Sequence, residues 1–392
     1  MYYVGIDIAK RSHEVCCLSE SGDILDGNSF KIANTQTGLN KLQAKFQKFK
    51  INNDNCLIGM EATGHYWLVL YSWLRKQGFS VKVINPIITD AFRKVSIRKV
   101  KNDSIDAEVI AKVLKFGEYQ ESLIAEEGLY SLKQLCRFRS AQIQMSGDLK
   151  RRIIALLDQV FPEYETLFSD IFCTTSAELL KNYTTPEEIA AIPTMKLEQF
   201  LKRISNGRLG IEKAGELKAA AANSIGITYG TDAFTFQIRM IIMQLQFLDA
   251  QIKEIENKIN EYMNKLNSPI TTIPGIGAVY GATILSELGD IQRFPSGKQI
   301  VSFAGIDASV KESGDFKGIH NHISKRGSPY LRKALWGAAF VAVRFNKEYS
   351  EYYSNLRARG KHHNVAICAV ARKLCYLIFA VLSENRPYRE IL

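Results

Sequence analysis

The chain has 392 residues, of which 46% are hydrophobic and 23% are charged. This is the balance of a globular protein and excludes a disordered or fibrous chain. The longest apolar runs, such as residues 334–343, are shorter than the about 20 residues that span a bilayer. The seven cysteines form no Cys-X-X-Cys pair, which indicates reduced core thiols and not a disulfide or zinc framework. Membrane, secreted and zinc-finger classes are therefore excluded, and we expect a cytoplasmic protein of two or three domains.

The net charge of +11 is unevenly distributed along the chain. Residues 291–392 hold 17 Lys and Arg against 7 Asp and Glu, whereas the other 290 residues hold 34 against 33. A basic surplus confined to one part of a chain indicates a polyanionic partner, most often nucleic acid. Charge alone does not separate this interpretation from a solvated basic surface.

Residues 1–120 have the pattern of one α/β domain with a mixed sheet. Short β-rich runs form a meander first, and apolar strands then alternate with helices, an order typical of such sheets. The expected strands are residues 2–8, 13–18, 24–32, 56–60 and 80–84, and the expected helices are residues 35–49, 65–77 and 103–114.

Residues 121–268 contain only helical patterns, beginning with one long helix over residues 129–161 that ends before Pro162. Between residues 238 and 266, apolar residues recur in steps of three and four over about four heptads, which predicts a coiled coil. A long amphipathic helix packed within its own domain is the alternative. The apolar positions are Ile238, Ile241, Leu245, Leu248, Ile252, Ile255, Ile259, Tyr262 and Leu266.

Residues 269–392 form the third expected domain, which is helical and strongly basic. It opens with Ile-Pro-Gly-Ile-Gly at residues 273–277 between two helical patterns, which predicts a helix-hairpin-helix. Its glycines, Gly275 and Gly277, allow backbone amides to approach a phosphate at a helix N-terminus. Such contacts hold a nucleic-acid backbone without reading its sequence.

Four acidic residues are candidates for metal ligands. Asp7 and Glu61 each end an apolar strand, where a carboxylate is costly unless it is paired or binds a metal. Asp103 and Asp106 lie three residues apart at the start of a helix, so both project from one face. Such a set is what an RNase H-like sheet uses to hold two Mg²⁺ ions on a phosphodiester. Structural alternatives are an N-cap role for Asp103, a dipole role for Asp106 and a solvent-facing Glu61.

Several short motifs follow one another along the chain. They are Gly5-Ile6-Asp7-Ile8-Ala9-Lys10, Glu61-Ala62-Thr63-Gly64, Lys101-Asn102-Asp103-Ser104-Ile105-Asp106-Ala107, Ile273–Asp290, and a C-terminal block from Phe303 through Ser313-Gly314 to Arg332. In this order they resemble the DEDD-type insertion-sequence transposases of the "one-ten" insertion-sequence family, to which Piv-type DNA invertases are related. The resemblance extends over nearly the whole chain.

The resemblance implies a RuvC-like (RNase H-like) N-terminal domain that supplies Mg²⁺ ligands. It also implies a C-terminal transposase domain whose serine attacks DNA, so that strand exchange passes through a covalent serine–DNA link. By position this serine is Ser313. The ligands implied by the resemblance are Asp7, Glu61, Asp103 and Asp106.

Three residues depart from the family pattern. Asn102 stands where threonine is frequent, and Asp307 and Ala308 stand where alanine and proline are frequent. The metal set is unaffected by these changes. The departures near residue 308 keep Ser309 as a second candidate for the nucleophile.

The resemblance also implies partners: donor and target DNA, and a structured guide (bridge) RNA that pairs with both. A homo-oligomer, either dimer or tetramer, follows from the coiled coil. Two other functions remain open, a Piv-like invertase and a catalytically idle nucleic-acid-binding protein. The candidates for RNA contact are Arg137, Arg139, Lys150, Arg151 and Arg152, and those for DNA contact are Lys317, Lys325, Arg326 and Arg332.

Overall fold

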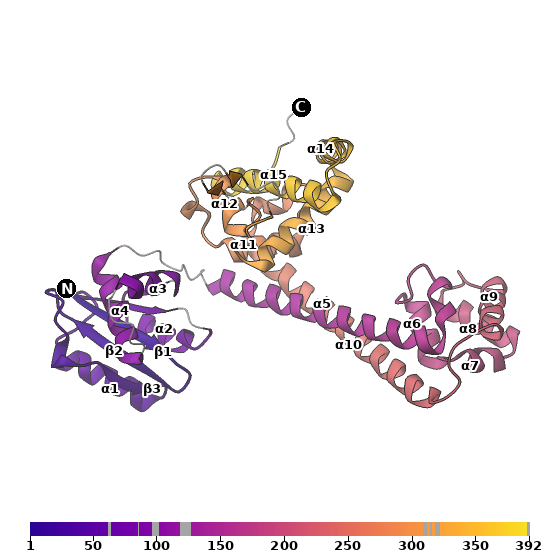
Figure 1. The fold of residues 1–392 in the computed structure, drawn as a ribbon, viewed down its shortest axis with the longest axis horizontal. Helices are drawn as coiled ribbons and strands as arrows, with labels where there is room; N and C mark the ends of the chain where they lie inside the picture. The colour runs from indigo at the N-terminus through magenta and orange to yellow at the C-terminus, as the bar shows by residue number, and fades with distance from the viewer. Residues whose placement is uncertain are drawn as a thin grey trace. The chain divides into compact units, whose positions relative to one another are not determined.

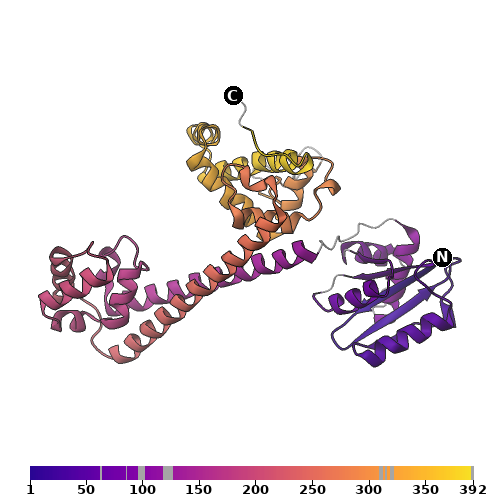
Figure 2. The ribbon, with the colours of Figure 1, turned by 180° about the vertical axis from the view of Figure 1, so that it is seen from behind.

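The structure is a computed structural model that describes residues 1–61, 64–84, 86–95, 102–117, 127–308, 312, 313, 316, 317 and 322–389. The chain divides into two units, Met1–Ile124 and Ala125–Leu392. The first unit is α/β and the second is almost entirely helical (Figures 1 and 2).

The first unit is built on a five-stranded mixed sheet. Its order is β3-β2-β1-β4-β5, with β1 antiparallel to β2, β2 antiparallel to β3, and β4 parallel to both β1 and β5. The predicted mixed sheet is therefore confirmed. The strands are β1 (Tyr2–Ile8), β2 (Ser12–Leu18), β3 (Phe30–Ala33), β4 (Cys56–Glu61) and β5 (Val81–Ile84). The helices are α1 (Gln36–Lys48), α2 (Trp67–Lys76), α3 (Pro86–Val95) and α4 (Asp103–Phe116).

The two faces of the sheet are covered differently. On one face, Val4 and Ile6 pack with apolar side chains of α1 and α2. On the other face, α4 crosses β1, β2 and β4. A Cβ atom on Gly5 would lie 2.1 Å from the carbonyl oxygen of Ala107, so the backbone of α4 rests directly on β1. Gly59 likewise lets α4 approach β4 closely, because a Cβ atom on Gly59 would lie 2.7 Å from a side-chain carbon of Leu114.

We expect Gly5→Ala to lower the free energy of unfolding by about 2–3 kcal/mol, because the added methyl must push α4 away from the sheet. Urea denaturation followed by circular dichroism measures this. Gly128→Ala is the matched control, since no atom of the described residues lies within 4 Å of its Cβ position and alanine is favoured over glycine in a helix. Equal unfolding midpoints for the two variants would contradict the close packing.

The second unit is organised around two long helices, α5 (Glu127–Val160) and α10 (Thr231–Leu266). They lie side by side and run antiparallel (Figures 1 and 2). At one end Ile153 of α5 shares a core with Ile238 of α10, and at the other end Leu132 shares a core with Met263. The apolar face of α10 is thus used within the chain, as the alternative to a coiled coil expected.

A helical module, residues 161–230, connects the two long helices at one end. Its helices are α6 (Thr174–Asn182), α7 (Pro186–Ala191), α8 (Thr194–Ile204) and α9 (Ile211–Ala222). Phe161 and Tyr164 are fully buried in the core that these helices form with the ends of α5 and α10.

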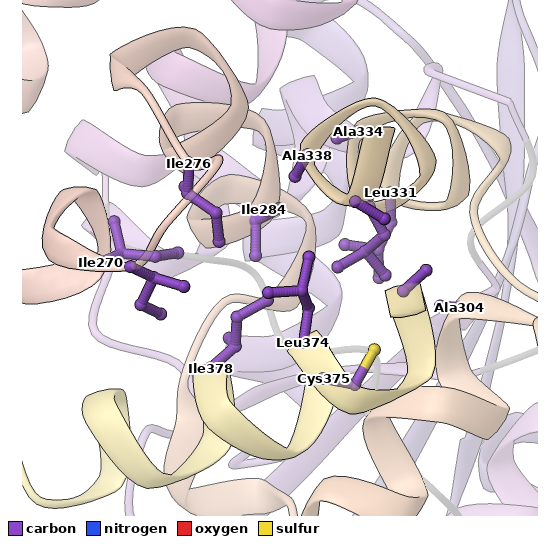
Figure 3. Close-up of a cluster of buried hydrophobic side chains, with 14 of the residues drawn as sticks. Ile270, Ile276, Ile284, Ala304, Leu331, Ala334, Ala338, Leu374, Cys375 and Ile378 are labelled. Atoms are coloured by element: carbon purple, nitrogen blue, oxygen red, sulfur yellow. The ribbon is translucent and has the colours of Figure 1, made fainter. Parts of the chain in front are cut away.

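The C-terminal core surrounds the other end of the helix pair. Figure 3 shows Ile270, Ile284, Leu331, Leu374 and Ile378 within it. Because Leu132 and Met263 also belong to this core, the finer division of the second unit at residue 268 stays a prediction. The elements are α11 (Ala278–Leu288), α12 (Gly297–Ala304), β6 (Glu312–Ser313), β7 (Phe316–Lys317), α13 (Pro329–Phe345), α14 (Lys347–Ala358) and α15 (His363–Ser383).

Helix α15 is long and apolar enough to cross a membrane by length and composition, with a mean hydropathy of 2.1 over its most apolar window. Its sequence contains no long uninterrupted apolar run, because Arg372 and Lys373 divide it. Here it is a helix of the C-terminal core, with Val370, Leu374 and Ile378 buried.

Candidate active site and nucleic-acid surfaces

Two acidic residues lie at the carboxyl edge of the sheet, on the face that α4 covers. β1 and β4 are parallel with Ile6 opposite Met60, so the following residues, Asp7 and Glu61, lie side by side. Side chains alternate between the faces of a strand. Asp7 therefore projects to the same face as Gly5, against which α4 packs. The same alternation places Glu61 on this face.

The other two acidic residues are in the first turn of α4. Asn102 caps the helix, because its side-chain oxygen accepts a hydrogen bond from the backbone N–H of Ile105 at 2.8 Å. Asp103 is exposed and Asp106 is half-buried. The alternative role of Asp103 as the N-cap is therefore wrong, and the departure at residue 102 preserves a capping side chain.

The pKa of Asp7 reflects the proximity of the other three carboxylates. Burial, and after it the negative charges of Asp106, Asp103 and Glu61 in that order, together raise the pKa of Asp7 from an ordinary value of 3.8 to about 6. Like charges gathered in a partly buried place are costly unless a cation offsets them. Strongly shifted pKa values are typical of functional sites.

The donor set fits a hard divalent cation. All four side chains offer carboxylate oxygens, the ligands that Mg²⁺ prefers over the nitrogen and sulfur ligands of zinc. Within the part of the chain that the structure describes, no group of three His, Cys, Asp or Glu side chains lies close enough together to hold a metal ion. The carboxylates are thus gathered at one edge of the sheet without being drawn in to coordinating distance.

Two hydroxyl-bearing contacts that sequence analysis missed hold this edge in place. The buried Oγ1 of Thr89, on α3, lies 3.0 Å from Oε2 of Glu61 and 2.9 Å from the carbonyl oxygen of Pro86, so its proton is shared between two acceptors. Ser29 donates to Glu14, the cross-strand neighbour of Asp7, and its Oγ lies 2.7 Å from that of Ser104 on α4. Thr89 therefore orients Glu61, and the serine pair joins the start of α4 to β2.

Most of the basic residues predicted to contact RNA on α5 have protein partners. Arg137 makes two hydrogen bonds to the buried carboxylate of Glu287, at 2.7 and 3.1 Å. Arg139 donates to Glu256 at 2.8 Å. These two arginines therefore join α5 to α11 and α10, and their contact with nucleic acid stays a prediction. Of the others, Arg151 pairs with Asp148, Lys150 lies over the ring of Phe172, and Arg152 is exposed.

The two glycines predicted to approach a phosphate are in different environments. Gly275 has φ +85°, and its Cβ would lie 2.4 Å from the carbonyl oxygen of Ala338. Its role is therefore to let this loop pack against α13. Gly277 precedes the first turn of α11, and within the described ranges no other atom comes within 4 Å of its Cβ position. It lines a groove of about 770 Å³ over residues 271–280, so its surroundings agree better with the phosphate prediction.

The serine candidates lie in the second unit. Ser313 is in β6, which pairs with β7 so that Ser313 is opposite Phe316 and Glu312 is opposite Lys317. Ser309 lies outside the described residues. Lys325 and Arg326 are exposed, as expected for side chains that contact DNA. Arg332 donates to the carbonyl oxygen of Ala304 at 3.0 Å.

Comparisons with known proteins find two family models that match separate parts of the chain. A family model described as "Transposase" matches residues 4–162, and a model described as "Transposase IS116/IS110/IS902 family" matches residues 267–354. The first match covers the sheet, the four acidic residues and α5, and the second covers the Ile-Pro-Gly-Ile-Gly loop and Ser313. The five-stranded sheet is consistent with a RuvC-like domain.

Curated relatives match over almost the full chain. The pilin gene-inverting protein of Moraxella bovis is 25% identical over 98% of this chain and 97% of its own length. The insertion element IS110 uncharacterized 43.6 kDa protein of Streptomyces coelicolor is 24% identical over 99% of this chain and 95% of its own length. The transposase for insertion sequence element IS1328 of Yersinia enterocolitica is 22% identical over 99% and 98%.

Proposed function

Because the chain belongs to the IS110 family of transposases, we propose that it is a Mg²⁺-dependent recombinase that cleaves and exchanges DNA strands through a covalent serine–DNA intermediate. The observation that carries the proposal is the gathering of Asp106, Asp103 and Glu61 around Asp7. This arrangement has a strong electrostatic cost, which a divalent cation would offset. Its proposed place of action is the cytoplasm.

The four carboxylates would hold Mg²⁺, which when bound polarises a phosphodiester and stabilises the charge that develops on it. The chain's own contribution is to position the ligands. Gly5 lets α4 approach β1 closely, and Asn102 fixes where the helix begins. Thr89 orients the carboxylate of Glu61.

Ser313 is the proposed nucleophile, because it stands at the family's serine position and within the second matched model. In the first step a bond forms between its Oγ and the scissile phosphorus, while the bond from phosphorus to a deoxyribose oxygen breaks. The serine proton is lost and the leaving oxygen gains a proton. Since the serine–phosphate ester conserves the phosphodiester linkage, a second DNA end can reverse the step and be joined. Ser309 remains the second candidate.

Donor DNA, target DNA and a guide RNA are the proposed nucleic-acid partners. The basic surplus of residues 291–392 supports DNA binding by this part of the chain, with Lys325, Arg326 and the amides after Gly277 as contacts. The guide RNA rests on the family resemblance alone.

The test uses the full chain with the DNA that flanks its gene and RNA transcribed from that DNA, in Mg²⁺ and in EDTA. We expect joined products and an SDS-stable protein–DNA adduct in Mg²⁺ only. DNA binding with no adduct and no products would instead identify an idle nucleic-acid-binding protein.

Inversion is the second candidate function, because relatives of this chain are named pilin gene-inverting proteins. The two functions differ in their DNA substrate and not in their chemistry. A plasmid with two inverted copies of the flanking sequence should yield inverted product if the chain is an invertase. Products joined to an unrelated target would favour transposition.

A second copy of this chain is the proposed protein partner, but through a different face of α10 from the one the heptads suggested. Leu245 and Leu248, two of the predicted seam positions, are buried within the chain. Spacings of four, three and four residues place four exposed side chains on one stripe of the helix. The stripe is formed by Phe236, Met240, Met243 and Phe247, each between 41% and 66% exposed.

The surroundings of this stripe favour a protein partner over nucleic acid. The helical module of residues 161–230 holds 7 Lys and Arg against 9 Asp and Glu, so it does not attract a polyanion. Next to the stripe are Gln237 and Gln244, which are uncharged, and Arg239, whose charge is paired with that of Glu188. Two copies of such a surface meet without like-charge repulsion, as a two-fold interface requires.

We expect Met243→Glu combined with Phe247→Glu to give a smaller particle by light scattering, with little change in the unfolding midpoint. Leu245→Glu is the matched control, because Leu245 is only 6% exposed and burying an unpaired charge costs several kcal/mol. The control should therefore unfold more easily. An unchanged particle mass for the double variant would show that the stripe is not an interface.

A further inference from the structure

A pocket of about 520 Å³ lies in the C-terminal core between α13 and α15. This size is within the range of about 300–1,000 Å³ that small-molecule sites occupy. Its described lining contains two arginines, Arg332 and Arg372, and no acidic residue. The described lining is therefore positively charged, and the indole of Trp336 forms one wall of the pocket.

Trp336 forms a rigid platform at this wall. Its indole is stacked on the ring of Phe340, with centroids 5.6 Å apart and planes 9° from parallel. The guanidinium of Arg344 lies over the same Phe340 ring, 4.3 Å from its centroid. The indole of Trp336 also makes an edge contact with the ring of His363. The indole is nevertheless 38% exposed. Because Trp336 lines the pocket, its exposed indole is available to a planar ring bound there.

The two arginines are held next to this platform. Arg332 lies one helical turn before Trp336, and a hydrogen bond of 3.0 Å to the carbonyl oxygen of Ala304 fixes its guanidinium. The Nε of Arg372 is buried and has no hydrogen-bond partner among the described residues. A buried donor without a partner is costly unless a ligand accepts its hydrogen bond. Guanidinium groups are suited to phosphate oxygens.

We infer that this pocket holds one unstacked nucleotide of the DNA strand, with its base on Trp336 and its phosphate at Arg332 and Arg372. Base–aromatic stacking with cationic contacts to the backbone is the usual way that proteins hold unpaired nucleotides. The inference rests on the proposed function for the presence of DNA.

The position of the pocket explains why DNA is the favoured source of the nucleotide. Ala308 and Ile323 line the pocket and pair with each other in an antiparallel bridge. The chain between them carries Ser313. A nucleotide in the pocket therefore belongs to the strand that is presented to the serine-bearing segment, and it would fix the register of that strand.

The test follows Trp336 fluorescence in the full chain. Trp67 and Trp73 are the other two tryptophans, and both are in α2 of the first unit. The double variant Trp67→Phe/Trp73→Phe leaves Trp336 as the only tryptophan, so the tryptophan fluorescence comes from this residue alone. The DNA probe is a duplex with one unpaired adenine, compared with the same duplex carrying an abasic site at that position. We expect strong quenching and about tenfold tighter binding for the adenine probe, with affinity measured by anisotropy.

Variants separate the roles of ring and charge. Trp336→Leu should remove the preference for the adenine probe, and Trp336→Phe should retain most of it because a ring remains. Arg372→Gln should weaken binding of the adenine probe more than Arg359→Gln, which removes an equal charge from an exposed position.

Equal binding and equal quenching with the two probes would overturn the pocket assignment while leaving DNA binding, and thus the proposed function, intact. Failure to bind any DNA would overturn both. A preference seen only when the bulged strand is RNA would overturn DNA as the source of the nucleotide.

Discussion

We expect Asp7→Asn to lower the rate of DNA strand cleavage in Mg²⁺ by about 10³-fold or more, because metal polarisation of a phosphodiester supplies several kcal/mol of the barrier reduction. Asp7 is at the centre of the four carboxylates, so its loss removes a ligand while leaving the shape of the side chain unchanged. Cleavage of a labelled duplex, followed on a denaturing gel, measures this. Binding of DNA should be retained, since no basic residue is removed.

The same substitution should not destabilise the metal-free protein. The pKa of Asp7 is raised from 3.8 to about 6 in the folded state. Below both values Asp7 is neutral in either state. Between them the folded state binds the proton more tightly, so stability falls as the pH rises, and above about 6 the full cost of the ionised carboxylate is present. In EDTA at pH 7.5, Asp7→Asn should therefore unfold at an equal or higher temperature than the wild type, with a free energy of unfolding greater by up to about 3 kcal/mol.

Asp26→Asn is the matched control on the same unit. Hydrogen bonds from Lys48 and Lys45 lower the pKa of Asp26, so this carboxylate is stabilising when ionised. Its loss should reduce stability slightly and leave cleavage unchanged. Wild-type cleavage by Asp7→Asn in Mg²⁺ would refute the assignment of the metal ligands.

The sheet and the carboxylates on it could be predicted because the signals are local. The strands around Asp7 and Glu61 are short apolar runs, and Asp103 and Asp106 follow a capping residue. The predicted strand over residues 24–32 is partly wrong: residues Leu25–Gly27 form a 3₁₀ turn and only Phe30–Ala33 is a strand. Asp26 has φ +57° there, a backbone conformation that ends strand pairing.

The partners of these residues could not be predicted, because they are far apart in the sequence. Thr89 reaches Glu61 across 28 residues, and Arg137 reaches Glu287 across 150. A run of basic residues on a helix has the same appearance whether it binds RNA or an internal carboxylate.

The partner of the apolar face of α10 also could not be predicted from the sequence. Periodicity identifies an apolar face but not what covers it, and α5 covers this face within the chain. The exposed stripe beginning at Phe236 is offset from the heptads and became visible only once the buried face was known.

We expect Ser313→Ala to abolish both the SDS-stable protein–DNA adduct and recombination, while DNA and RNA binding remain within about twofold of the wild type. The substitution removes one oxygen and no charge, so phosphate contacts are unaffected. Ser309→Ala is the matched control and should recombine normally. A radiolabelled DNA substrate with the products separated on SDS gels shows the adduct directly.

The comparison of the two serine variants also separates three chemistries. In a two-metal nuclease water attacks the phosphorus, so no variant of the chain would ever form an adduct. Loss of the adduct in Ser309→Ala with its retention in Ser313→Ala would assign the nucleophile to residue 309. Normal recombination by both single variants would refute attack by either serine.

If Ser313 is the nucleophile, Ser313→Ala and Asp7→Asn should both fail to cleave. The two variants would fail for different reasons. Ser313→Ala lacks the hydroxyl that forms the ester, whereas Asp7→Asn retains this hydroxyl and lacks a carboxylate that assists its attack.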